Sequence, residues 1–485
     1  MLPQHPSEHQ NAAIVSLIGR PRSVLDVGCG AGVNGMAARA ADTRVTGIER
    51  DPDLAEQARR VLDEVYCVDP EAAESVASAL GDRRFDLILM PDILERAQNP
   101  EQLVRRYVGY LEREGRLILS TRNADAWPVR FGVASPEIGY STMTGQSPAL
   151  FRREDAVRFA ESAGLEVMSI DLNPMLLKSL RSLVSESFYM SLRSGDEVGS
   201  GYREVSVYDL YRGTVRPFER ALARLAPRLL AFQNVVVARR KPEPRKLSLT
   251  VGMLTMDEEP SAAKMIAEIR KYAPDAKILC VDSSLKDQTP VIAERLGARV
   301  LRQLPPRGHG PAMELLMYEA AKQTEALIYL DCDFTYPPSV IPELREILES
   351  GIDVVNATRI RTRPAAMPLP NYFANKTFVM LARLLNGVPV SDLHSGMRAY
   401  RSSVIRSFAF DGEGDALPID TLLWPARLGY RVVEVPIEYQ ERVGISKLRK
   451  LAGTVWTFIR LKNTWKVGSR RADTYEVWDG FHHKS

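Results

Sequence analysis

Short apolar runs alternate with amphipathic stretches along the whole chain, a pattern that predicts strands followed by helices. In the first half, the apolar runs with the length of buried strands are residues 23–27, 44–48, 85–89, 115–120 and 232–238. In the second half, the comparable runs are residues 247–254, 277–281, 298–301 and 326–330. Strands that alternate with helices in this way are typical of α/β proteins with a parallel sheet. The pattern therefore predicts two such sheets, one in each half.

A short charged segment with two prolines, residues 241–246, separates the two sets of strands and is interpreted as a linker. We therefore predict a first domain over residues 1–240 and a second over residues 247–470, with a tail over residues 471–485. Residues 174–231 alternate amphipathic stretches with Gly and Ser breaks, and are interpreted as a helical insertion in the first domain.

Composition narrows the class of protein. The 485 residues are 26% charged and 45% hydrophobic, an ordinary globular mixture with a net charge of only +3, so a nucleic-acid partner is not expected. The four cysteines lack the spacing of a zinc site or a disulfide framework. No apolar run approaches the ~18 residues of a transmembrane helix, and the first residues do not have the pattern of a signal peptide. We expect a cytoplasmic protein, or one that is peripheral at the inner membrane surface.

A glycine-rich turn follows the first apolar run. Gly28, Gly30 and Gly32 remove Cβ atoms where a ligand must approach the backbone, and the start of the next helix adds positive potential. The second strand ends at Glu49, where a carboxylate suits ribose hydroxyls. Such turns occur in dinucleotide-binding and methyl-donor folds alike, although the spacing here does not meet G-x-G-x-x-G.

The segments that carry these features, residues 25–32, 47–52, 85–95 and 115–120, resemble successive motifs of class I S-adenosylmethionine-dependent methyltransferases. The resemblance covers roughly residues 20–240 and implies a Rossmann-like sheet that binds S-adenosylmethionine. The cofactor-binding residues that it implies are Asp26, Gly28, Gly30 and Gly32 around the methionine moiety, Glu49 at the ribose and Asp69 at the adenine.

One departure from the methyltransferase pattern affects catalysis. Close relatives often have Leu-Glu-His where this chain has Leu94-Glu95-Arg96. Arginine stays protonated and cannot act as a base. The identity of any base is therefore open, as is competence for methyl transfer.

In the second half, Asp331 and Asp333 follow the apolar run at residues 326–330, and two prolines then open a helix. Alternate residues of a strand point in parallel, so both carboxylates reach one point only if the strand has broken into a turn. Two such carboxylates suit a hard divalent cation that also bridges phosphate oxygens. A solvated acidic turn explains the same two residues, so the neighbouring segments decide between these interpretations.

Polar residues also follow the other strands of the second half, namely Thr255 and Glu258 after the first and Asp282 after the second. Carboxyl ends of parallel strands form the usual ligand crevice. Together with Asp-x-Asp and Pro-Pro, the segments at residues 395–398, 434–437 and 442–448 resemble inverting family-2 glycosyltransferases of the GT-A fold. The likeness is to the polyprenyl-phosphate sugar synthases, such as dolichyl-phosphate mannose synthases, and covers residues 247 to about 465.

This resemblance implies a nucleotide-sugar donor, with Mg²⁺ or Mn²⁺ between its diphosphate and the metal ligands Asp331 and Asp333. The implied nucleotide-sugar-binding residues are Thr255, Glu258, Asp282, Asp331 and Asp333, and the implied acceptor or phosphate ligands are Arg398, Arg442 and Lys447. The candidate catalytic residues are Asp333 and Asp420. Asp420 matches a family carboxylate beside the acceptor, although a carboxylate at a helix N-terminus explains it equally well. Thr335 stands where dolichyl-type synthases often carry Gln, and is a poorer ligand.

Two helical stretches, residues 372–385 and 448–462, combine apolar and basic residues as an interfacial helix does, although packing on the protein's own sheet explains both. We expect a bifunctional enzyme of cell-envelope polysaccharide assembly. Its activities would be inverting, metal-dependent transfer of a sugar to a lipid-linked (polyprenyl-phosphate) or glycan acceptor, and methylation of a sugar hydroxyl. The alternative is that only the glycosyltransferase domain is active and the other domain is a binding or docking module.

Overall fold

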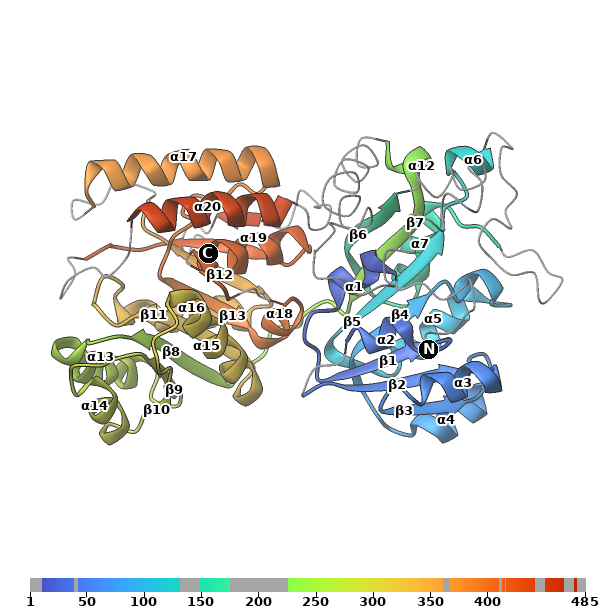
Figure 1. Ribbon diagram of the computed structural model, residues 1–485, viewed down its shortest axis with the longest axis horizontal. Coiled ribbons are helices and arrows are strands. Elements are labelled where there is room, and N and C mark those ends of the chain that lie inside the picture. The colour runs from blue at the N-terminus through green and yellow to red at the C-terminus, as the bar shows by residue number, and fades with distance from the viewer. Residues whose placement is uncertain are drawn as a thin grey trace, which may run out of the picture. The chain divides into compact units, whose positions relative to one another are not determined.

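The chain forms two compact units, Met1–Lys241 and Pro242–Ser485, each with its own α/β sheet (Figure 1). The boundary between the units falls at the predicted linker. The end of this linker is already bound to the second unit, because the backbone N of Arg245 donates to the Glu349 carbonyl at 2.9 Å. The computed structural model describes residues 11–38, 42–130, 149–174, 226–360, 367–409, 412–414, 416–440, 450–465 and 475–477. Most of the predicted helical insertion, residues 175–225, lies outside these ranges.

The sheet of the first unit has seven strands in the order β3-β2-β1-β4-β5-β7-β6. Its strands are β1 (Ser23–Val27), β2 (Arg44–Glu49), β3 (Glu64–Cys67), β4 (Phe85–Pro91), β5 (Leu111–Arg122), β6 (Glu166–Pro174) and β7 (Ala231–Arg239). The predicted strand at residues 232–238 is therefore present. However, β7 runs antiparallel to both of its neighbours, so the sheet is mixed rather than parallel.

Helices cover both faces of this sheet because successive residues of a buried strand point to opposite faces. Leu25 and Val27 of β1 belong to a core shared with α4, α5 and α7, whereas Asp26 points to the other face and contacts α2. The helices are α1 (Ala12–Ile18), α2 (Val33–Met36), α3 (Pro52–Ala58), α4 (Ala73–Leu80), η1 (Leu94–Arg96), α5 (Pro100–Val108), α6 (Trp127–Arg130), α7 (Arg153–Ser162) and α12 (Pro227–Leu230).

The sheet of the second unit has eight strands in the order β10-β9-β8-β11-β13-β12-β14-β15. Its strands are β8 (Leu249–Thr255), β9 (Lys277–Asp282), β10 (Arg299–Arg302), β11 (Ala326–Asp331), β12 (Val354–Thr358), β13 (Met397–Arg401), β14 (Val432–Pro436) and β15 (Tyr475–Val477). The edge strand β15 belongs to the segment predicted as a tail. The sheet is also mixed, because β13 runs antiparallel to β11 and β12.

The reversal of β13 positions the site. An antiparallel strand begins at the edge where its parallel neighbours end, so the residue before β13, Gly396, lies beside the end of β11. The backbone N of Asp331 donates to the Gly396 carbonyl at 3.2 Å. The carboxyl ends of β8, β9 and β11 and the start of β13 therefore share one edge of the sheet.

Helices pack on both faces of the second sheet as well. One core joins α13 and α16 to the sheet, and α15 approaches the opposite face closely because Gly252 has no Cβ against Leu316. The helices are α13 (Glu259–Tyr272), α14 (Thr289–Arg295), α15 (His309–Gln323), η3 (Pro338–Val340), α16 (Ile341–Glu349), α17 (Leu369–Asn386), α18 (Ser402–Arg406), α19 (Leu417–Arg427) and α20 (Lys450–Trp465).

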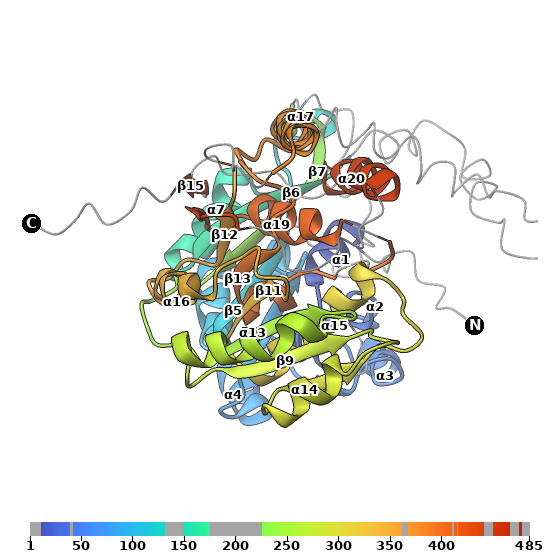
Figure 2. The same cartoon turned by 90° about the vertical axis from the view of Figure 1, so that its left-hand side faces the viewer.

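The two helices expected to be amphipathic, α17 and α20, lie side by side at the outside of this unit (Figures 1 and 2). Phe378 and Phe458 join them edge to face, with ring centroids 5.4 Å apart. The inner side of α20 packs on α19. Within the described residues, no helix combines the length and apolar character needed to span a bilayer.

Candidate functional site

Asp282 ends β9 and fixes the ends of two neighbouring strands. Its buried carboxylate accepts hydrogen bonds from Thr255 Oγ1 at 2.6 Å and Ser284 Oγ at 2.7 Å. Arg302 Nε lies 3.4 Å from its other oxygen. Thr255 and Asp282, both predicted to bind the nucleotide-sugar, therefore lie together at the carboxyl ends of β8 and β9, and their contact with a ligand stays a prediction.

Asp257 follows β8 at the same edge of the sheet and was not among the predicted site residues. Its Oδ1 accepts the backbone N–H groups of Leu285 and Lys286, each at 3.1 Å, and so joins the loops after β8 and β9. Its left-handed φ of 51° turns the chain at this point. The predicted ligand Glu258 follows, half-buried, with its backbone N donating to Thr289 Oγ1 at 2.9 Å. The signal available in the sequence was the position of Asp257 between two residues that were selected.

The strand that carries Asp-x-Asp does break into a turn, as convergent carboxylates require. Strand β11 ends at Asp331, and Phe334 has a left-handed φ of 62°. Asp333 is buried, and its Oδ1 accepts from Thr335 N at 3.0 Å and Thr335 Oγ1 at 2.5 Å. Thr335 therefore orients Asp333 in this structure.

The half-buried Asp331 carboxylate packs directly on the backbone of Gly396. A Cβ at position 396 would overlap Asp331 Oδ2 and would lie 2.9 Å from Cε2 of Tyr336. The hydroxyl of Tyr336 accepts the Gly396 N–H at 2.6 Å. Glycine is therefore required at this position of the Ser-Gly-Met-Arg segment to admit the carboxylate.

The donor set fits a hard divalent cation in part. Among the described residues, no group of three or more His, Cys, Asp or Glu side chains forms a metal site. Two carboxylates, Asp331 and Asp333, suffice for Mg²⁺ or Mn²⁺ when diphosphate oxygens and water complete the coordination. Such a cation would neutralise charge on a departing diphosphate.

Arg398 was predicted to bind the acceptor or a phosphate, and its position in the structure contradicts this prediction. Its side chain is fully buried, and its guanidinium donates to Asn356 Oδ1 at 2.7 Å and to the Leu393 carbonyl at 2.8 Å, with further bonds to Pro418 O and Thr421 Oγ1. These contacts join β12, β13 and α19, so Arg398 holds the core together instead of facing a phosphate. The other predicted cations, Arg442 and Lys447, lie outside the described residues.

Arg359 and Asp392 form a buried ion pair beside Asp-x-Asp. Arg359 Nε and Nη2 donate to Asp392 at 2.7 and 2.9 Å, and the guanidinium lies 5.8 and 5.3 Å from the ring centroids of Tyr336 and Tyr439. Burial alone would raise the pKa of Asp392, but the Arg359 guanidinium holds it well below its usual range. Burial also lowers the pKa of His394 to about 4, so its ring is neutral. Arg359 was not among the predicted site residues, because its pairing with Asp392 is visible only in the folded structure.

Asp420, the candidate base, forms an ion pair between helices. Its Oδ2 accepts from Arg460 Nη1 at 2.6 Å and its Oδ1 from Thr464 Oγ1 at 3.1 Å, and the pair is nearly fully buried. Asp420 does lie in the first turn of α19, but it serves to hold α20 against that helix. The geometry therefore gives Asp420 a structural task that neither sequence interpretation included.

In the first unit, the glycine-rich turn follows β1 as predicted. Gly28, Gly30 and Gly32 have φ values of 69°, 56° and 83°, which side chains rarely adopt. Glu49 fixes this turn, because its Oε2 accepts the Gly30 N–H at 2.9 Å and its Oε1 accepts the Asp51 N–H at 2.9 Å. Glu49 therefore orients the turn and lies where ribose binding was predicted.

Asp26 lies beneath the glycine-rich turn. Its Oδ2 accepts the Gly35 N–H at 2.9 Å, and its buried Oδ1 has no hydrogen-bond partner among the described residues. Burial raises its pKa to about 7 against the effect of the Gly35 bond, and Glu49 adds to the rise. An orphaned acceptor at this place fits a ligand with an amino group, as the methionine moiety has. Asp69 is exposed, and its Oδ1 accepts the Glu71 N–H at 2.9 Å.

A polar centre at the ends of β4 and β5 was not among the predicted site residues. Asp92 accepts from Ser120 Oγ and Gln233 Nε2, each at 2.5 Å, and its left-handed φ is 51°. Nearby, Glu95 is buried with its Oε1 accepting the Arg122 N–H at 2.6 Å. Burial, and then the charge of Asp92, raise the pKa of Glu95 to about 8. The departure at Arg96 pointed to this segment without indicating the acidic pair.

Comparison with known proteins confirms the family predicted for each of the two units. Residues 6–170 match a methyltransferase domain and residues 250–408 match glycosyl transferase family 2. The dolichyl-phosphate hexose transferase of Haloferax volcanii is 38% identical over 206 residues, which are 42% of this chain and 88% of that protein. The undecaprenyl-phosphate mannosyltransferase of Micrococcus luteus is 25% identical over 237 residues, which are 47% and 94% of the two chains.

Among solved structures, glucosyl-3-phosphoglycerate synthase from Mycobacterium tuberculosis, in complex with Mn²⁺, uridine diphosphate and glucosyl-3-phosphoglycerate, is 21% identical with a TM-score of 0.37. The match covers 46% of this chain and 81% of that one.

The second unit, which matches the family model and contains the Asp-x-Asp turn, is thus a glycosyltransferase. The chain belongs to glycosyl transferase family 2 and carries a methyltransferase domain in its first unit.

Replacing Gly396 by Ala tests the fit of Asp331 against the backbone. The new Cβ displaces the Asp331 carboxylate, and we expect roughly a hundredfold loss of glycosyl transfer with a small change in melting temperature. Gly453→Ala in α20 is the matched control, because a Cβ there meets nothing within 4 Å. Equal activities of the two variants would contradict the proposed fit.

The raised pKa of Glu95 makes the stability of the first unit depend on pH. Between the ordinary value of 4.5 and about 8, the folded state retains a proton that the unfolded chain has lost, so the free energy of unfolding falls as pH rises through this window. Glu95→Gln removes this dependence on pH. The free energy of unfolding of the variant minus that of the wild type should therefore be higher at pH 8 than at pH 5 by a few kcal/mol. Hydrogen exchange of β4 and β5 amides measures this difference. The exposed Glu101→Gln is the control, and a difference that does not change with pH would refute the assignment.

Proposed function

We propose that the second unit transfers a hexose from a nucleotide-sugar to a polyprenyl phosphate, with inversion and with Mg²⁺ or Mn²⁺ held by Asp331 and Asp333. The observation that carries this proposal is the Asp331 carboxylate packed on Gly396 at the edge where Thr255 and Asp282 end their strands. The named relatives act on dolichyl and undecaprenyl phosphates, which supports a polyprenyl-phosphate acceptor.

In this reaction an acceptor phosphate oxygen forms the bond to the anomeric carbon while the bond to the nucleoside diphosphate breaks. The phosphate is already ionised, so no side chain has to take a proton. Because no base is needed, the pairing of Asp420 with Arg460 between two helices is compatible with the reaction. The contribution of the protein is to orient the donor and to balance the charge of the leaving group.

For the first unit, we propose S-adenosylmethionine-dependent methylation of a sugar hydroxyl on the same product. The bound cofactor supplies the methyl group, and Asp26, Glu49 and the glycine-rich turn hold it. A hydroxyl acceptor loses a proton. The acidic pair of Asp92 and Glu95 lies at the ends of β4 and β5, and because the raised pKa of Glu95 leaves that carboxyl protonated near neutral pH, Asp92 is the member that would take the proton. The alternative, a docking module without catalysis, is separated from this proposal by calorimetric titration with S-adenosylmethionine.

A membrane-surface location fits a lipid-linked acceptor. The exposed residues Phe373, Met380 and Leu384 follow one another along α17 at spacings that place them on one helix face. Exposed Val455 and Phe458 lie on α20 beside it. Neither helix contains an acidic residue, whereas both contain lysine and arginine. We propose that this α17–α20 face contacts anionic lipid at the cytoplasmic surface of the membrane.

Asp331→Asn tests the glycosyl transfer proposal. Loss of one of two metal ligands should reduce metal-dependent release of nucleoside diphosphate by about a hundredfold or more. Asp275→Asn is the control, because Asp275 is an exposed partner of Arg345 away from the crevice. Unchanged release in Asp331→Asn would remove the metal role from the proposal.

Phe373→Ser combined with Leu384→Ser tests the membrane contact. Removal of two exposed apolar side chains should weaken binding to vesicles with anionic lipid by about tenfold or more, measured by cosedimentation. Leu296→Ser, at an exposed leucine after α14, is the matched control. Equal binding by the double variant and the control would show that another surface meets the lipid.

A further inference from the structure

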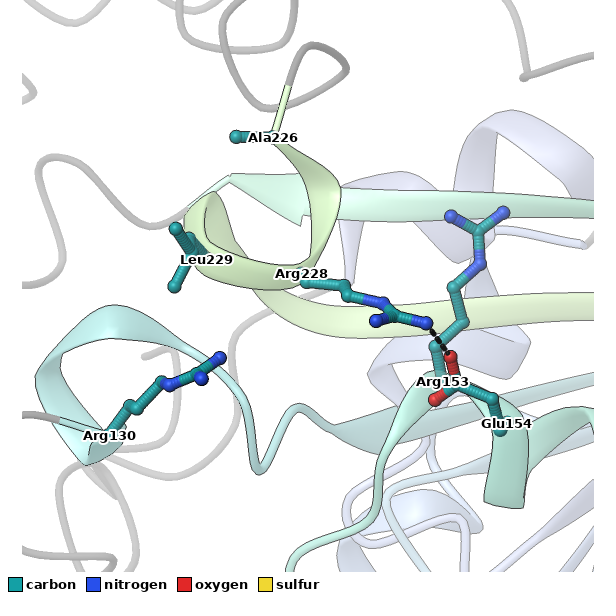
Figure 3. A pocket seen from close by; sticks show the side chains of 6 residues that line it. All are labelled: Arg130, Arg153, Glu154, Ala226, Arg228 and Leu229. Atoms are coloured by element: carbon teal, nitrogen blue, oxygen red, sulfur yellow. Dashed lines mark hydrogen bonds and ion pairs between the residues drawn. The ribbon is translucent and has the colours of Figure 1, made fainter.

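Three arginines line a cavity of about 460 Å³ in the first unit (Figure 3). Arg130 ends α6, Arg153 begins α7 and Arg228 belongs to α12, so three separate elements contribute one guanidinium each. Glu154, Ala226 and Leu229 complete the lining. The cavity has the size of a small-molecule site, and its described charged lining is three cations to one anion.

The cavity lies near the end of β5 and the start of β7. Strand β5 ends at Arg122 and the antiparallel β7 begins at Ala231, so both open toward the edge that carries the glycine-rich turn. The segments of the cavity follow and precede these two strand ends. The acidic pair of Asp92 and Glu95 lies at the same edge, because the Arg122 N–H donates to Glu95. The cavity is therefore placed for a part of the methyl acceptor that is remote from the reacting hydroxyl.

One wall of the cavity is fixed by a buried amide. Asn123 Nδ2 donates to the Arg228 carbonyl at 2.7 Å and to the Ala231 carbonyl at 2.8 Å. Asn123 itself is only 3% exposed and pairs with Phe151 in an isolated bridge. The backbone that carries Arg228 is thus held to the end of β5, so the guanidinium is presented from a set position.

A carboxylate already occupies part of this cationic environment. Glu154 Oε1 lies 2.6 Å from Arg228 Nη2, at the start of the ten-residue helix α7. A backbone N–H at that helix start, and then Arg228, hold the pKa of Glu154 below its ordinary value. Figure 3 shows the Arg228 and Glu154 side chains reaching toward one another from opposite sides. The site therefore accommodates an anionic oxygen in contact with Arg228.

We propose that this arginine cavity binds the phosphate or diphosphate group of the methyl acceptor, and that Glu154 takes the place of a phosphate oxygen when the acceptor is absent. The proposal rests on the proposed methyl transfer and specifies its substrate class as a sugar attached to a phosphate. Arginine suits this task because its planar guanidinium binds phosphate oxygens in a bidentate way.

The probe is inorganic pyrophosphate, titrated calorimetrically into the full-length chain with a chelator present, so that metal-dependent binding in the second unit is suppressed. Arg228→Gln should weaken binding by about tenfold, the loss expected for one charge-assisted contact. Glu154→Gln should tighten it severalfold, because the competing carboxylate is gone. Both substitutions break the same ion pair, so a merely structural role of that pair would move both variants in the same direction.

The matched controls are Arg59→Gln and Glu56→Gln, which break an exposed ion pair of 2.9 Å on another face of the same domain. Neither should change pyrophosphate affinity. Pyrophosphate that does not bind, or that binds equally to wild type, Arg228→Gln and Glu154→Gln, overturns the inference. Tightening by Glu56→Gln as large as that by Glu154→Gln would also overturn it, as the effect would then be one of overall charge.

Competition identifies the source of the phosphate. Displacement of pyrophosphate by a short-chain polyprenyl phosphate supports a lipid-linked acceptor, and displacement by a nucleoside diphosphate supports methylation of the nucleotide-sugar. Titration with S-adenosylmethionine separates the two levels of the argument. If the cofactor binds and pyrophosphate does not, this inference alone fails, whereas absence of cofactor binding defeats the proposed methyl transfer on which it rests.

Discussion

The second unit depends on one close contact, that of the Asp331 carboxylate with the bare backbone at Gly396. The contact exists because β13 runs against its neighbours and so begins where β11 ends. Tyr336 continues from it, since its hydroxyl accepts the Gly396 N–H and its ring lies against the Arg359 guanidinium, which pairs with Asp392. A substitution at any of these residues would shift the position of the Asp-x-Asp turn, because each side chain is packed on the next.

Buried charge sets the precision of this unit. Arg398, Arg401 and Arg460 are almost fully buried, and each donates to backbone carbonyls or to a carboxylate of its own unit. A buried guanidinium is stable only if its donors are satisfied, so it tolerates one arrangement of its neighbours and penalises others. The cost of desolvation makes such residues weak evidence for stability and good evidence for a fixed geometry. These buried cations therefore fix how the strands and helices of the second unit pack on one another.

Local patterns allowed nine of the fifteen strands in the described residues, the glycine-rich turn and the Asp-x-Asp turn to be predicted, because the signal for each lies within a few consecutive residues. The directions of β7 and β13 were not predicted, since apolar runs have no information about which way a strand is traversed. Arg398 was misassigned because its hydrogen-bond partners cannot be read from neighbouring residues. They come from β12, the segment before β13 and the start of α19. Arg359 and the acidic pair of Asp92 and Glu95 were missed because their character comes from burial and pairing across the fold.

The two proposed reactions differ in whether they need a base, and this difference follows the placement of the carboxylates in the two units. Transfer to a phosphate oxygen needs no base, and in the second unit Asp420 is committed to Arg460 while Asp331 and Asp333 remain at the crevice. Transfer to a hydroxyl needs a proton acceptor, and in the first unit two acidic side chains share a site whose burial keeps one of them protonated near neutral pH. If the methyl acceptor is a sugar phosphate, as proposed, its hydroxyl would meet the acidic pair and its phosphate the arginine cavity, because the segments of both adjoin the ends of β5 and β7.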